Sequence, residues 1–233
     1  KKAAVCQFPV NPGPGLEGIV DVITMKFYNR KGEEQEIPAA YADEAESLRA
    51  ELMEKAAEGS DELMEKFFET MELTTDEIRE GLRLGLVKGE TIPVFCVAAK
   101  EDIGVKRLME FIVNVVPSPE GKEEPTVDGG TLKCDPAGPT ALFIFKTSVE
   151  QHQGEISYFK VMSGTLNEGA DLVNPETGNS ERLSAIYAVV GAKKEKVASL
   201  SAGDIGCAMK LKAGKTDVTL AQPGVEAVKH MDL

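Results

Sequence analysis

The 233-residue chain holds few groups that could act as a catalytic base or nucleophile. Its histidines are His152 and His230, and the polar neighbours of His152 are typical of a solvated loop. No Ser or Cys nucleophile is visibly paired with either imidazole. The carboxylates between residues 40 and 80 are too many and too regularly exposed to indicate a glycosidase pair. The sequence therefore disfavours an independent hydrolase.

Motifs for phosphates, dinucleotides and metals are also missing from the sequence. There is no G-x-x-x-x-G-K-[ST] loop and no dinucleotide fingerprint. Cys6, Cys96, Cys134 and Cys207 show no C-x-x-C spacing, which disfavours a zinc site. Three of these cysteines lie in apolar runs, where a free thiol packs as a small hydrophobe. We expect a reduced, cytosolic protein without a membrane span and without a cofactor of its own.

Acidic residues are concentrated in one segment of the chain. The net charge is −13, which argues against a simple nucleic-acid clamp. Residues 40–80 hold 14 carboxylates and four basic residues, a net charge of −10. Helical spacing places five of these carboxylates around the exposed side of one helix: Asp43, Glu46, Glu51, Glu54 and Glu58. They form either a solvated helix face or a docking face for a basic partner.

The chain changes character near residue 117. Helical periodicity dominates before this point, and short β-like runs separated by Gly, Pro and Asn follow it. Residues 117–125 are rich in Pro, Gly and charge and are typical of a linker. We therefore expect one domain over residues 1–120 and another over 121–233, with a linker at about 117–137. The sequence lacks an initiator Met and stops abruptly, so we expect both ends to lie inside a longer protein.

The first part is predicted to be α/β. Residues 4–8 and 19–28 favour strands, and residues 39–58 favour an amphipathic helix. Ser60 is expected to cap a second helix, and Thr74 and Glu77 form a capping-box pattern for a third. Residues 92–97, apolar on both faces, then predict a buried parallel strand, followed by a helix from Val105 to Val115. Since one such β-α unit makes no sheet, the rest of the sheet is expected to lie outside the chain.

The second part is predicted to be a small antiparallel barrel. Residues 142–145 and 157–162 favour short strands between Gly-rich turns. Residues 204–212 alternate most clearly. Ile205, Cys207, Met209 and Leu211 are expected on one face, with Gly206, Ala208, Lys210 and Lys212 on the other.

Four stretches of the chain resemble elongation factor G, a translational GTPase family, in the same order. They are residues 7–10 (QFPV) with 18–22 (GIVDV), 61–67 (DELMEKF) with 73–78 (LTTDEI), 92–94 (IPV) with 98–100 (AAK) and 117–119 (PSP), and 161–166 (VMSGTL) with 202–205 (AGDI). The resemblance implies the end of a GTPase domain with the helical insertion called G prime, then the all-β domain II barrel of translation factors. Departures from the family pattern, such as Lys160 where the family has Arg, indicate a divergent paralogue.

The resemblance implies site residues near the end of the GTPase domain. Ala98, Ala99 and Lys100 match the fifth guanine-nucleotide motif, whose backbone amides contact the base. The phosphate-binding groups and the catalytic part are expected to be missing from this chain. The whole protein would use GTP and Mg²⁺, whereas this part would bind neither.

The resemblance also implies ribosomal partners for a cytoplasmic protein. The acidic helix (Asp43, Glu46, Glu51, Glu54 and Glu58) would meet the stalk protein of the large subunit. The barrel would rest on small-subunit rRNA through Lys160, Arg182, Lys210 and Lys212; no membrane or DNA is implied. Two alternatives stay open: a ribosome-protection or release-type GTPase that shares the barrel, and a stand-alone acidic adaptor for a basic protein.

Overall fold

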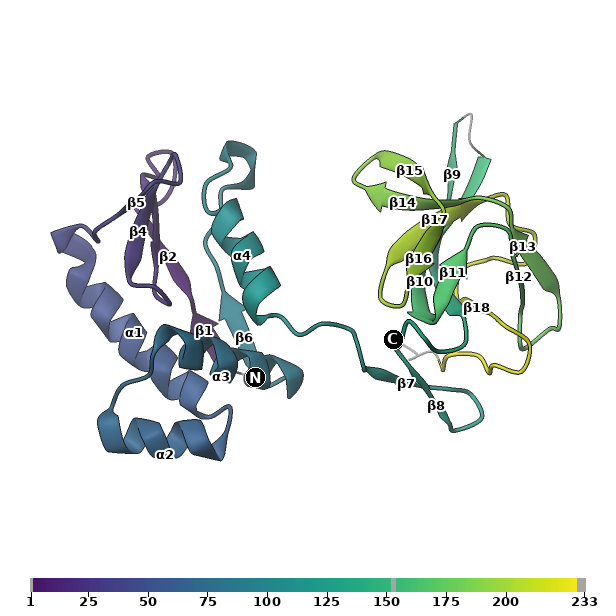
Figure 1. Ribbon diagram of the computed structural model, residues 1–233. Helices are drawn as coiled ribbons and strands as arrows, with labels where there is room; N and C mark the ends of the chain where they lie inside the picture. Colours follow the sequence, from purple (N-terminus) through teal and green to yellow (C-terminus); the bar gives the residue numbers. More distant parts are fainter. Residues whose placement is uncertain (1, 152–153, 230–233) are drawn as a thin grey trace. The chain divides into compact units, whose positions relative to one another are not determined.

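The computed structural model describes residues 2–151 and 154–229, so both histidines lie outside the described residues. The chain divides into two compact units, residues 1–118 and 119–233 (Figure 1). Within the described ranges, no helix combines the length and the apolar character needed to cross a membrane.

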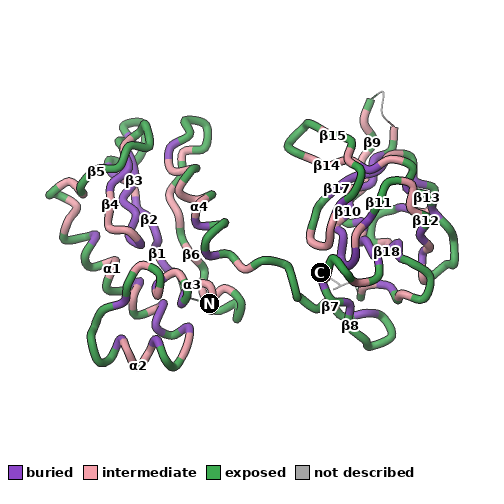
Figure 2. Tube along the Cα trace, in the orientation of Figure 1, coloured by how far each residue is buried: buried purple, intermediate pink, exposed green. Residues whose placement is uncertain are grey.

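Unit 1 contains two small sheets. β1 (Lys2–Val5) pairs in parallel with β6 (Thr91–Val94). The other sheet is antiparallel and follows the chain in the order β2 (Gln7–Val10), β3 (Gly18–Asp21), β4 (Lys26–Asn29) and β5 (Glu34–Gln35). Buried residues follow β2 and β3 (Figure 2). This sheet forms one wall of the core of unit 1.

The prediction of one strand over residues 19–28 is wrong, because a turn separates β3 from β4. Asp21 closes this turn by accepting hydrogen bonds from the amide of Thr24 (2.9 Å) and from its hydroxyl (3.1 Å). Met25 then adopts a left-handed conformation with φ of 55°. A carboxylate that caps its own following backbone is a turn signal, although this segment has no Gly or Pro.

Helices cover one part of the sheet layer. Ser60 accepts a hydrogen bond from the amide of Leu63 (3.3 Å), and Thr74 and Glu77 form the complete capping box. Both predicted caps are therefore confirmed. The helical elements are η1 (Ala39–Tyr41), α1 (Ala42–Ala57), α2 (Asp61–Thr70), α3 (Thr75–Val87), η2 (Ala99–Glu101) and α4 (Val105–Val115).

The close packing of α1 on α3 depends on Gly81. A Cβ atom at this position would lie 2.1 Å from the carbonyl oxygen of Ala56, so no larger residue fits without moving the backbone. Leu52 and Ile78, both at most 1% exposed, fill the contact beside it. The two helices therefore pack closely against each other.

The predicted buried strand at residues 92–97 differs from the structure. β6 ends at Val94, and the side chains of Ile92 and Val94 are 48% and 39% exposed. Within the described chain, β6 pairs with β1 along one edge and has no strand along the other. The apolar side chains of β6 are therefore only partly buried by the described residues.

Unit 2 is the predicted antiparallel barrel. Its main sheet has the strand order β13-β12-β18-β9-β10-β17-β14-β15. The strands of this sheet are β9 (Ala141–Glu150), β10 (Gly154–Ser163), β12 (Ala170–Val173), β13 (Ser180–Leu183), β14 (Ile186–Val190), β15 (Lys193–Val197), β17 (Ile205–Met209) and β18 (Val218–Ala221). Two further pairs are β7 (Glu123–Pro125) with β8 (Thr131–Lys133) and β11 (Thr165–Asn167) with β16 (Ser199–Ser201).

The orientation of β17 shows which of its two faces is interior. Ala208 belongs to the barrel core with Phe159, and a Cβ at Gly206 would lie 2.3 Å from a methyl carbon of Leu200. Small residues therefore face inward, and Ile205 and Cys207 face outward. The strand ends at Met209 because Lys210 is left-handed (φ of 58°). Leu211 then enters the core, so its predicted place on the face of Cys207 is wrong.

Arg49 joins the acidic helix α1 to the turn between β3 and β4. Its guanidinium donates to the carbonyls of Val22 (2.9 Å) and Ile23, and the hydroxyl of Thr75 on α3 donates to Ile23 as well (3.3 Å). Burial lowers the pKa of this guanidinium, and nearby Asp21 opposes that shift. The guanidinium of Arg49 thus supplies hydrogen-bond donors to the backbone carbonyls of Val22 and Ile23.

We expect Arg49→Met to lower the free energy of unfolding by about 2–3 kcal/mol, because charge-assisted hydrogen bonds to two carbonyls are lost. Urea unfolding followed by circular dichroism at 222 nm measures this change, since the described helices all lie in unit 1. Arg83→Met is the matched control, because Arg83 forms an exposed pair with Glu80; it should cost less than about 1 kcal/mol. Equal losses in both variants would contradict the anchoring role of Arg49.

Glu77 makes unit 1 sensitive to acid. The pKa of Glu77 is lowered to about 2. The largest cause is a hydrogen bond from Lys66, and hydrogen bonds from the amide and the hydroxyl of Thr74 act in the same direction. Because its pKa is lower in the folded state, ionised Glu77 stabilises the fold at pH values above its unfolded pKa of 4.5. This stabilisation is lost as the pH falls toward 2. The stability difference between the wild type and Glu77→Gln, below about 1 kcal/mol at pH 7, should vanish near pH 2. Thermal unfolding at pH 7, 4 and 2 tests this; a constant difference would contradict it.

Candidate functional site

The loop between β6 and α4 contains the predicted guanine-contact residues. Ala98 and Ile103 bind each other through both backbone groups, with N–O distances of 2.9 and 3.2 Å. The amides of Glu101 and Asp102 donate back to the carbonyls of Ala98 and Ala99. The amides of Ala99 and Lys100, which open η2, have no hydrogen-bond partner among the described residues. Two exposed residues thus present free backbone donors.

The loop is held by contacts on its other side. Ile103 is 2% exposed and packs with Leu16, Ile19 and Tyr28. Gly104 follows with φ of 78°, and a Cβ there would lie 2.6 Å from the carbonyl oxygen of Cys96. The packing of Ile103 and the turn at Gly104 fix the loop conformation, and α4 begins directly afterwards at Val105.

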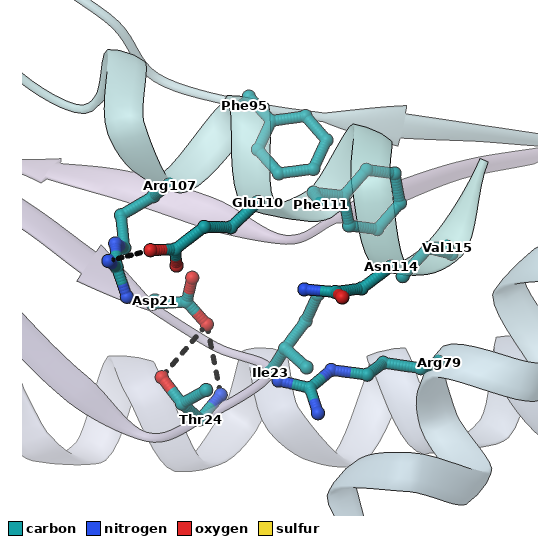
Figure 3. Close-up of a pocket in the computed structure, with 10 residues that line it drawn as sticks. All are labelled: Asp21, Ile23, Thr24, Arg79, Phe95, Arg107, Glu110, Phe111, Asn114 and Val115. Atoms are coloured by element: carbon teal, nitrogen blue, oxygen red, sulfur yellow. Dashed lines mark hydrogen bonds and ion pairs between the residues drawn. The ribbon is translucent and has the colours of Figure 1, made fainter.

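A small pocket with a mixed polar and apolar lining lies where α4 meets the β3 turn and α3 (Figure 3). Asp21 lies at one side of it, and Arg107 pairs with Glu110 along α4. The guanidinium of Arg107 also lies 4.5 Å from the centre of the Tyr28 ring. The cavity of about 50 Å³ has room for a few water molecules and is far below the size of a nucleotide site. These contacts secure α4, and no nucleotide pocket is formed here.

The five predicted acidic residues are all exposed, four of them on α1 and Glu58 directly after its end. Glu58 pairs with Lys2 at 2.7 Å, and Glu51 lies 3.6 Å from Lys55. The three other carboxylates have no ion-pair partner in the part of the chain that the structure describes: Asp43, Glu46 and Glu54. They leave uncompensated negative charge on one side of the helix.

The predicted barrel cations occupy two regions of unit 2. Lys160 lies on β10 opposite Ile205 of β17. Arg182 on β13 pairs with Asp171 at 2.8 Å, while Lys210 and Lys212 are exposed in the segment after β17. The amide of Ala213 in that segment donates to Glu181 on β13. The structure thus brings the segments of Arg182 and Lys212 together, whereas β12, β18 and β9 separate β13 from β10.

Two tyrosines on the barrel surface are not among the residues predicted from the sequence. Tyr158 and Tyr187 lie on β10 and β14, and both pair across strands with Cys207 of β17. A short apolar run rich in β-branched residues at 186–190, followed by Gly191, is the local signal for the hairpin that presents Tyr187. The pairing of distant strands that aligns the tyrosines has no such signal.

Known proteins resemble this chain in sequence and in fold. A family profile described as "Elongation factor G domain 2" matches residues 139–221. Elongation factor G of Thermotoga neapolitana is 34% identical over 92% of this chain and 32% of its own length. That of Thermotoga maritima is 33% identical over 92% of the chain and 33% of its own length.

The fold is shared with a crystal structure of a Thermus thermophilus protein. Its TM-score is 0.77 at 24% identity, over 96% of this chain and 32% of that protein. The chain therefore spans about a third of the length of the relatives it matches. Both units contribute to the sequence match, since it covers 92% of the chain. These matches show that the chain is a fragment of an elongation factor G-like protein.

Proposed function

We propose that the whole protein is a ribosome-dependent, cytoplasmic GTPase that promotes translocation in protein synthesis. In this proposal the present chain supplies ribosome-docking surfaces and lacks the groups that act on phosphate. The observation that carries the proposal is the 34% identity to an elongation factor G across both units.

The loop after β6 would contact the guanine base in the whole protein. The free amides of Ala99 and Lys100 fit a carbonyl oxygen acceptor, since both are exposed backbone donors in a fixed loop. GTP with Mg²⁺ supplies the phosphoryl group that is transferred to water. The residues of this chain would only orient the base, because the sequence holds no P-loop.

The remainder of the GTPase domain would cover an apolar surface of unit 1. Ile92 and Val94 on β6 are exposed, and Met109 and Val113 on α4 are 53% and 78% exposed. Exposed apolar side chains on adjoining elements are typical of a surface that packs against another body. This surface favours a larger domain over the alternative of a stand-alone adaptor.

The acidic face of α1 would bind the stalk protein of the large ribosomal subunit. Asp43, Glu46 and Glu54 have no ion-pair partner among the described residues. A basic partner can approach them without breaking an existing pair, and opposite charge also speeds the encounter.

The barrel would contact small-subunit rRNA. Lys160, Lys210 and Lys212 have no ion pair in the described ranges and can reach phosphate oxygens. Arg182 pairs with Asp171, but both side chains are more than 60% exposed. Such a surface pair is weak enough to exchange for a phosphate contact.

We expect the 233-residue chain alone neither to bind nor to hydrolyse GTP, because two amides at the base edge cannot replace the phosphate contacts. Fluorescence anisotropy with a fluorescent GTP analogue measures binding, and the full-length protein serves as the positive control. Micromolar binding by the chain alone would contradict the assignment of its loop as a base contact only.

We expect Glu51→Lys combined with Glu54→Lys to weaken binding of the stalk protein at least fivefold at physiological salt, since four units of charge are changed. Binding of the full-length protein to purified stalk protein measures this, followed by ribosome binding with and without GTP. The matched control is Glu176→Lys with Glu226→Lys, two exposed carboxylates of unit 2 that undergo the same charge change.

Equal weakening in the control would indicate a general charge effect in place of a docking face. Unchanged binding in the Glu51 and Glu54 variant would contradict the stalk assignment of α1.

A further inference from the structure

A row of five side chains crosses the barrel sheet from β9 to β15. Tyr158 on β10 pairs with Lys146 of β9 on one side and Cys207 of β17 on the other. Tyr187 on β14 pairs with the same Cys207 and with Lys196 of β15. Directly opposed residues share a face of the sheet. The row therefore reads lysine, tyrosine, cysteine, tyrosine, lysine on one surface.

This row lies on the outside of the barrel. Phe159, Ile186 and Ala208, each next in sequence to a member of the row, belong to the barrel core. Their neighbours must point to the opposite face, because side chains alternate along a strand. Cys207 nevertheless has no exposed surface, and its cross-strand neighbours are the two tyrosines. Both tyrosines remain partly exposed.

Lysines surround the two tyrosines. The ammonium of Lys146 lies 5.9 Å from the centre of the Tyr158 ring, and Lys160 lies two residues further along the same strand. Neither lysine has an ion-pair partner among the described residues. Lys194 and Lys196 pair with Glu150 (2.9 Å) and Glu168 (2.6 Å). Two unpaired cations thus flank aromatic rings in a protein with a net charge of −13.

Glu150 holds the hydroxyl end of the Tyr158 side chain in place. It accepts hydrogen bonds from the hydroxyl of Tyr158 (3.3 Å) and from Lys194 (2.9 Å), whose side chain is only 11% exposed. Lys194 lowers the pKa of Glu150, so the carboxylate stays charged and keeps both bonds. The ring orientation of Tyr158 is therefore set before any ligand arrives, which reduces the entropy lost on binding.

We propose that this outer face binds unpaired RNA bases, which stack on Tyr158 and Tyr187 while Lys146 and Lys160 contact the phosphates. Aromatic rings on a sheet surface with cations beside them suit single-stranded nucleic acid, because every base offers a flat face. One strand separates the two rings, a spacing of about 10 Å, so each ring takes its own base. The inference rests on the proposed rRNA contact and specifies unpaired RNA as its target.

The test compares single-stranded with double-stranded RNA on the 233-residue chain. Fluorescence anisotropy at low salt measures binding of a labelled ten-nucleotide oligoadenylate and of a labelled ten-base-pair duplex. Tyr158→Leu and Tyr187→Leu should each weaken single-strand binding about tenfold and leave duplex binding unchanged. Tyr158→Phe, which keeps the ring but loses the hydrogen bond to Glu150, should weaken single-strand binding far less than Tyr158→Leu does. Tyr41→Leu in unit 1 is the matched control, and circular dichroism checks that each variant folds.

The outcomes separate this inference from the rRNA proposal on which it rests. Unchanged single-strand binding in both leucine variants would overturn the stacking role, and so would an equal loss for the duplex. If Lys160→Glu still weakens both RNAs in that case, phosphate contact by the barrel stands without base stacking. If neither RNA binds the wild-type chain, both proposals fail. A Tyr158→Leu variant that unfolds leaves Tyr187→Leu to decide.

Discussion

The architecture of unit 1 depends on the two carbonyl groups of the turn that follows β3. Val22 and Ile23 are buried at this turn, so their carbonyls need donors from the helices that cover them. Arg49 and Thr75 provide these donors from α1 and α3. One set of hydrogen bonds therefore fixes the position of both helices on the sheet. The exposed carboxylates of α1 are presented to solvent as a consequence of this attachment.

In unit 2, the space available inside the barrel determines which side chains lie on its outer surface. Gly206 and Ala208 face the interior because Leu200 and Phe159 leave no space for larger side chains on β17. The larger residues of this strand must then lie outside, where Cys207 fits between two tyrosines. A packing requirement inside the barrel thus determines which chemistry its surface displays.

Elements specified by local contacts could be predicted from the sequence, as the caps at Ser60 and at Thr74 with Glu77 show. The turn at Asp21 could not, because it is closed by a side chain in a segment that otherwise alternates like a strand. The inward face of β17 was also hidden, since both of its faces are apolar and only the neighbours of Gly206 distinguish them. The tyrosine row depends on pairing between strands far apart in sequence, which periodicity does not encode.

The arrangement of charges around Tyr158 and Tyr187 favours selective binding of unpaired bases over non-selective attraction to phosphates. Glu150 and Glu168 neutralise Lys194 and Lys196, which limits the net positive charge of the face. A duplex offers a barrel surface mainly phosphates, and the two unpaired lysines of this face give little affinity for it at physiological salt. Unpaired bases add stacking on the rings, a contribution that salt screens far less. The carboxylates therefore shift the preference of this face from charge toward base stacking, within a chain that is acidic as a whole.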